Sequence, residues 1–198
     1  MFDAINQYLF ALINAPGIAN TFPSFALWVA ADWLIIGLAV LMLIGWIIAE
    51  KHQQRALFNA GLSAIFGLLI SYAIQTIWPH PLPAAMGFGQ QVFKHTGDAS
   101  FPSDHGTVMF SVALALLLSK SRFGYLALLA ALITAWARIL LGHHWPFDML
   151  AALLVAFSAA LVVCTLLPRR LTWVFESVLA VYNWLKKPFR PIASKFRR

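Results

Sequence analysis

Residues 123–167 read FGYLALLAALITAWARILLGHHWPFDMLAALLVAFSAALVVCTLL, and this stretch decides the fold. Its flanks, Phe123–Leu141 and Phe147–Leu167, are almost entirely apolar. Each is close to the length of about 20 residues that a helix needs to cross a bilayer. Between them, Gly142–Pro146 is a short turn that contains two histidines. The pattern predicts two membrane-spanning helices joined by a polar turn at one membrane face.

Three further stretches are apolar enough to be spans. They are Trp33–Ala49, with an upstream extension through Phe22–Ala31, Ala56–Trp78 and the shorter His105–Ser119. Pro102 and Ser103 precede the shorter stretch and suit a turn followed by a helix N-cap. The sequence therefore predicts an all-α transmembrane bundle of about five spans. It forms a single domain over residues 1–198, with its core at about residues 33–167.

The composition indicates that lipid is the solvent for much of this chain. Hydrophobic residues make up 61% of the sequence and charged residues 11%, whereas soluble domains carry roughly 25% charged residues. The net charge of +7 lies in loops and in the C-terminal tail, which argues against a nucleic-acid partner. Cys164 is the only cysteine, so an internal disulfide and a thiolate zinc cluster are both excluded.

Both ends of the chain are expected to lie along the membrane surface. Phe2–Ala15 is apolar but is interrupted by Asn6, Gln7 and Asn14, which is typical of an interfacial helix. Leu171–Leu185 mixes aromatic with polar residues and leads into a basic tail. We expect residues 171–198 to bind an anionic membrane surface. A sixth span in this segment is the alternative.

Basic residues indicate how the spans are oriented. All but Lys94 and Arg138 of the 14 lysines and arginines lie in the loops Glu50–Arg55 and Lys120–Arg122 or in the tail from Arg169 onwards. With five spans these three regions share one side of the membrane. The positive-inside rule then places the C-terminus in the cytoplasm and the N-terminus outside.

Ionisable and hydroxyl side chains gather on the opposite side, in the loop Pro79–Asp104, the turn Gly142–Pro146 and the adjoining helix ends. They are His80, Lys94, His95, Asp98, Ser103, Asp104, His105, Arg138, His143, His144 and Asp148. Ionisable groups are costly to hold near lipid, so such a cluster predicts a functional site.

The spacing Arg138-x5-His144-x3-Asp148 predicts a reactive imidazole. His144 and Asp148 are four residues apart and would share one face of a helix. A carboxylate there can accept Nδ1–H and leave Nε2 as a base or nucleophile. Gly142 lets the chain turn, so that Arg138 can approach the imidazole. A guanidinium beside such an imidazole suits a phosphate group.

The start of the span after Phe101 predicts an anion site. Ser103 at the N-cap, with backbone N–H groups at the positive end of the helix dipole, can bind phosphate oxygens. His105 in the first turn can protonate a leaving oxygen. This set of groups can carry out phosphoryl transfer with neither a metal nor another cofactor.

The segments Pro102–His105 and Arg138–Asp148 resemble the second and third motifs of the type 2 phosphatidic acid phosphatase superfamily. The resemblance covers Trp33–Leu167 and includes the layout of the spans. Within the superfamily, Phe101–His105 and Leu141–Asp148 are most similar to the bacterial undecaprenyl pyrophosphate phosphatase branch.

The resemblance implies a role for each motif residue. His144 would be the nucleophile that forms a phosphohistidine, Asp148 would orient it, and His105 would be the general acid. Ser103 and Arg138 would hold phosphate oxygens. The implied reaction is hydrolysis of undecaprenyl pyrophosphate to the monophosphate at the outer face of a bacterial inner membrane, which recycles a lipid carrier.

Other interpretations keep the membrane setting but change the activity. The same chemistry could serve a lipid A phosphotransferase or a phosphatidylglycerophosphate phosphatase, because no motif reads the lipid tail. A non-enzymatic alternative is a small transporter, and a haem or metal protein is another. The clustering at one face argues against the transporter, and the adjacent His143 and His144 have poor spacing for metal ligands.

The first motif of the superfamily, a lysine followed after six residues by Arg-Pro, is altered here. With its proline aligned to Pro83, Gln75 occupies the lysine position and Leu82 the arginine position. His80 and Lys94 are candidates to replace these cations. The expected substrate-binding residues are Ser103, Arg138, Asp104, Lys94 and His80.

Asp32 stands directly before the first span. An aspartate at the centre of a helix in lipid costs about 2.5–3.5 kcal/mol on insertion scales. We therefore expect the span to begin near Trp33 and Asp32 to lie at the outer interface as a helix N-cap. Contact with the active-site loops is the alternative.

Overall fold

The computed structural model describes residues 2–14, 27–89 and 99–187, and these ranges are predominantly helical. The α-helices are α1 (Phe2–Ile13), α4 (Leu34–Ile48), α5 (Lys51–Ile77), α6 (Asp104–Leu118), α7 (Phe123–Leu140), α8 (Pro146–Leu161) and α9 (Leu171–Lys186). Shorter segments are the π-helices η1 (Val29–Trp33) and η3 (Val162–Leu166) and the 3-10 helix η2 (Ala84–Met86).

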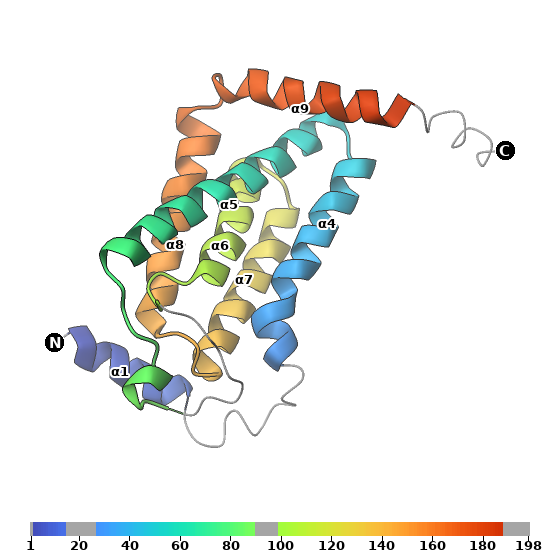
Figure 1. Cartoon of the computed structure of the whole chain (residues 1–198). Coiled ribbons are helices and arrows are strands. Elements are labelled where there is room, and N and C mark those ends of the chain that lie inside the picture. Colours follow the sequence, from blue (N-terminus) through green and yellow to red (C-terminus); the bar gives the residue numbers. More distant parts are fainter. Residues whose placement is uncertain (1, 15–26, 90–98, 188–198) are drawn as a thin grey trace.

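The expected all-α membrane bundle is confirmed. Helix α6 packs against α5, α7 and α8, and α4 lies at the side of the bundle (Figure 1). Four segments of the described ranges are long and apolar enough to cross a membrane: Val29–Ile48, Lys51–Ile77, Phe123–Leu140 and Pro146–Leu166. The fifth expected span, α6, is apolar but has only 15 residues.

Small residues let the central helices approach closely, as is common between helices in membranes. Ala60 of α5, Ala113 of α6 and Ala160 of α8 are fully buried in one cluster. At Gly67 of α5, an added Cβ would lie 2.8 Å from the hydroxyl oxygen of Ser111 on α6. The contact between α5 and α6 therefore depends on the absence of a side chain at Gly67.

Helix α1 covers the end of the bundle that carries the turn between α7 and α8 (Figure 1). Asn6 accepts a hydrogen bond of 3.0 Å from the backbone N–H of Phe147, at the start of α8. Asn14 donates one of 2.8 Å to the carbonyl of Leu140, at the end of α7. The polar residues that predicted a surface helix thus satisfy backbone groups at two helix ends.

Helix α9 lies across the opposite end of the bundle (Figure 1). Its Phe175 is buried and contacts the rings of Trp46 and Phe58. Arg55 of α5 donates a 2.9 Å hydrogen bond to the carbonyl of Pro168, just before α9. Among the described helices, α9 is not one of the four that are long and apolar enough to span.

Candidate active site

The turn between α7 and α8 brings Arg138 and His144 to the same end of the bundle. Gly142 has φ +75°, a left-handed conformation that favours glycine. The backbone N–H of His143 donates to the carbonyl of Arg138 at 2.9 Å and closes α7. Helix α8 begins at Pro146, so His144 precedes it, and the expectation that His144 shares a helix face with Asp148 was wrong.

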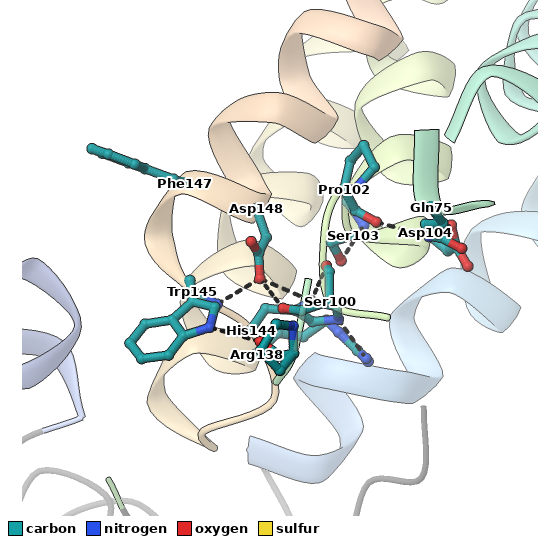
Figure 2. A network of polar contacts seen from close by, with 12 residues as sticks. Gln75, Ser100, Pro102, Ser103, Asp104, Arg138, His144, Trp145, Phe147 and Asp148 are labelled. Atoms are coloured by element: carbon teal, nitrogen blue, oxygen red, sulfur yellow. Dashed lines mark hydrogen bonds and ion pairs between the residues drawn. The ribbon is translucent and has the colours of Figure 1, made fainter. Parts of the chain in front are cut away.

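The imidazole of His144 is nonetheless held on both sides (Figure 2). Its Nδ1 lies 3.0 Å from the carbonyl oxygen of Ser100 and 3.5 Å from Oδ2 of Asp148. Its Nε2 lies 3.2 Å from Nη2 of Arg138. A carbonyl can only accept and a guanidinium can only donate, so Nδ1 carries the proton and Nε2 has a lone pair.

Asp148 is buried in the third position of α8, with 1% of its surface exposed. Its Oδ2 accepts hydrogen bonds from the backbone N–H of Trp145, at 2.8 Å, and from the hydroxyl of Ser100. A buried carboxylate requires such donors. Asp148 therefore fixes the start of α8 and the loop that orients His144.

Arg138 is also buried, with 1% exposed, and its counter-ion is Asp32. Nη1 of Arg138 lies 2.5 Å from Oδ1 of Asp32. The chain is already helical from Leu27, so the expectation that Asp32 is a helix N-cap at the start of the span was wrong. The alternative was contact with the active-site loops, and Asp32 instead contacts two expected site residues in helices, Arg138 of α7 and His105 of α6.

The N-terminus of α6 lies beside this pair. Ser103 is the N-cap as predicted, and its hydroxyl accepts a 3.3 Å hydrogen bond from the backbone N–H of Gly106. His105 follows in the first turn, with Nε2 3.8 Å from Oδ1 of Asp32. The two motifs of the sequence therefore meet through Asp32.

Asp104 and Gln75 form a second polar group next to Ser103 (Figure 2). Nε2 of Gln75 donates to Oδ1 of Asp104 at 2.8 Å and to the carbonyl of Pro102 at 3.0 Å. Ser71 donates to the same carboxylate oxygen at 2.9 Å. Leu82 is buried. The residues at both altered first-motif positions thus have packing or hydrogen-bonding roles in place of cationic ones.

The structure describes only one of the two residues proposed to replace the missing cations, His80 and Lys94. His80 contributes its carbonyl, which accepts a 2.7 Å hydrogen bond from the backbone N–H of Ser100. His80 also lines a cavity of about 230 Å³ together with Asp3, Asn6 and Trp145. Lys94 lies outside the described residues.

Sequence reasoning missed Ser100 as a site residue, although it is fully buried and contacts both His144 and Asp148. The one signal for it was its position in the polar stretch that leads to Ser103. Asp32 had a stronger signal, because a carboxylate next to an apolar span requires a partner.

A buried imidazole whose Nε2 has a lone pair, an arginine beside that nitrogen and a helix N-terminus are compatible with a phosphatase in the membrane, and the family of this chain is one of phosphatases. The chain belongs to the PAP2 superfamily, whose family model matches residues 54–172.

Curated relatives and a solved structure agree with this membership. The putative undecaprenyl-diphosphatase YbjG of Escherichia coli K12 is 36% identical over 163 residues, which cover 81% of this chain and 82% of YbjG. The undecaprenyl-diphosphatase BcrC of Bacillus subtilis 168 is 29% identical over 152 residues, or 77% of this chain and 79% of BcrC. The crystal structure of Aquifex aeolicus LpxE has the same fold, with a TM-score of 0.65 at 20% identity over 80% of this chain and 94% of LpxE.

Proposed function

We propose that this phosphatase hydrolyses undecaprenyl pyrophosphate to undecaprenyl phosphate and inorganic phosphate, with His144 as the nucleophile. The names of two similar proteins support the substrate. The observation that carries the mechanism is the pair of contacts on His144, to the Ser100 carbonyl at Nδ1 and to Arg138 at Nε2. These contacts select the tautomer whose Nε2 lone pair can attack phosphorus.

In the first step the terminal phosphate displaces Nε2 as the hydrogen-bond acceptor of Arg138. The lone pair of His144 then attacks phosphorus in line with the bridging oxygen. The N–P bond forms and the bond from phosphorus to the bridging oxygen breaks. Undecaprenyl phosphate leaves as His105 donates a proton to that oxygen. Arg138, Ser103 and the N-terminus of α6 stabilise the charge on the equatorial oxygens.

In the second step water attacks the phosphohistidine and the N–P bond breaks. His105, left neutral by the first step, accepts a proton from that water and so regains the protonated form in which the cycle began. The buried Asp148 stabilises the positive charge on His144 while the N–P bond exists. The enzyme returns to its starting tautomer when inorganic phosphate leaves.

The site is proposed to face the outside of the cytoplasmic membrane. The basic loops between α4 and α5 and between α6 and α7 lie at the same end of the bundle as α9, opposite the active site (Figure 1). The positive-inside rule assigns that basic end to the cytoplasm. The enzyme would then act on carrier lipid left in the outer leaflet after its cargo has been transferred.

Phosphate release from purified protein tests the proposal. The substrates are undecaprenyl pyrophosphate, phosphatidic acid, phosphatidylglycerophosphate and lipid A, each at the same detergent ratio. We expect the pyrophosphate to give the highest kcat/KM and His144→Ala to lower it by at least about a thousandfold. Near-normal turnover by a folded His144→Ala variant would refute the nucleophile, and a preference for another lipid would refute the substrate.

A further inference from the structure

The structure gives Asp32 a position that its sequence context does not explain. It lies in the π-helix η1, where the backbone N–H of Leu34 bonds to the carbonyl of Val29, five residues back. Single π-helical turns within α-helices occur often at functional sites. A carboxylate in a membrane span is also costly unless it has a partner.

Helix α7 holds η1 in place through two residues one turn apart. The hydroxyl of Thr134 donates to the carbonyl of Ala30 at 3.0 Å. Nη1 of Arg138 contacts the carbonyl of Ala31 at 3.4 Å as well as the Asp32 carboxylate. The backbone of the π-helix and the side chain of Asp32 therefore present acceptors to the same face of α7.

One oxygen of Asp32 serves two groups of the proposed mechanism. Oδ1 lies 2.5 Å from Nη1 of Arg138 and 3.8 Å from Nε2 of His105. Arg138 in turn places Nη2 3.2 Å from Nε2 of His144. Arg138 is almost fully buried, whereas the Asp32 side chain is 28% exposed. The carboxylate therefore lies between the buried site residues and the accessible surface of the protein.

We propose that Asp32 is a positioning residue for phosphoryl transfer, a hypothesis that rests on the proposed function. Its carboxylate fixes the guanidinium of Arg138 so that Nη2 faces the nucleophile. The same carboxylate lies 3.8 Å from Nε2 of His105, the proposed general acid. In the part of the chain that the structure describes, the charged and titratable groups of this cluster are Asp32, Asp104, His105, Arg138, His144 and Asp148, while α5 contributes the neutral Gln75.

Carboxylate-to-amide substitution separates this role from simple packing. In Asp32→Asn the shape is kept, but the charge opposite Arg138 and His105 is lost. A small misplacement of a group that contacts the reacting atoms can lower kcat by about a hundredfold. We expect that loss in kcat with no rise in KM, because the phosphate no longer competes with a carboxylate for Arg138.

Partial rescue by Asp32→Glu provides a readout that packing alone would not give, because glutamate fits the packed position less well than asparagine but restores the charge opposite Arg138. Glu176→Gln is the matched control, because Glu176 is an exposed carboxylate on α9, at the other end of the bundle. It should leave kcat and KM unchanged.

The experiment measures phosphate release from undecaprenyl pyrophosphate by wild type, Asp32→Asn, Asp32→Glu and Glu176→Gln, with a thermal melt of each. If Asp32→Asn does not accumulate, Asp32→Glu decides, and a kcat about tenfold below wild type is expected from the displaced carboxylate. A kcat equal to wild type in the variant that accumulates overturns the positioning role. An inactive wild type overturns the proposed function instead.

Discussion

Replacing Asp148 with asparagine should slow the enzyme strongly while preserving its fold. The amide oxygen of the introduced side chain can still accept the hydrogen bond that Trp145 donates at 2.8 Å, so the start of α8 should persist. What is lost is the negative charge 3.5 Å from Nδ1 of His144. That charge matters most when Nε2 is bonded to phosphorus and the ring is positive.

The size of the effect follows from the distance. Two unit charges 3.5 Å apart interact by about 5 kcal/mol at an effective dielectric constant of about 20. The Ser100 carbonyl still fixes the tautomer, and the dipole of the introduced amide recovers part of the interaction. We therefore expect a net loss of about 3–4 kcal/mol in transition-state stabilisation, or about a hundred- to a thousandfold in kcat.

Stopped-time phosphate release, with the melting temperature of each variant, measures this loss. Ser100→Ala serves as the graded comparison, because it removes only the hydroxyl that donates to Asp148 and keeps the carbonyl. Ser100→Ala should lower kcat about tenfold, the effect expected for the loss of one hydrogen bond to a charged group. If Asp148→Asn retained more than a tenth of wild-type kcat, the carboxylate would not be stabilising a charged His144, and the reasoning would fail.

Three further outcomes are expected. Gly67→Val should lower the free energy of unfolding by about 1–3 kcal/mol, because the valine side chain would clash with Ser111. Gly61→Ala should leave the free energy of unfolding unchanged, because the added Cβ meets no atom within 4 Å. Equal melting temperatures for the two variants would contradict the proposed packing. Activity should persist in excess EDTA, and a loss that zinc or magnesium reverses would point to a metal site. In a Cys164→Ala background, an impermeant maleimide added to intact cells should label Met86→Cys, in the exposed η2 turn, and spare Ser121→Cys; the reverse would place the site in the cytoplasm.

The spans could be predicted because lipid imposes a simple length and composition rule on each helix. Expected and observed bounds agree within a few residues for Phe123–Leu140 and for Pro146–Leu166. The Ser103 cap and the Gly142 turn could also be predicted from the sequence, since each depends on local backbone chemistry. These features require no knowledge of which helices are neighbours.

The contacts that complete the site depend on tertiary packing and could not be predicted in detail. Ser100 meets Asp148 across 48 residues, and Arg138 meets Asp32 across 106. The pairing of His144 with Asp148 was expected from a shared helix face, but it arises from a turn that precedes α8. A π-helix inside an apolar run leaves no periodic signal in the sequence. Contact of Asp32 with the site was therefore expected only as the alternative to a helix N-cap.

The shortness of α6 affects how far the substrate must leave the bilayer. Fifteen residues at 1.5 Å each extend about 22 Å, whereas the hydrocarbon layer is about 30 Å thick. If the Lys120–Arg122 turn lies at one set of headgroups, as in the proposed orientation, Ser103 and His105 would lie several ångströms below the other set. The pyrophosphate of the proposed substrate would then reach His144 by moving a short distance into the membrane, while its isoprenoid chain stays in the leaflet. Membrane thickness should consequently tune the reaction rate, and thicker bilayers should slow it.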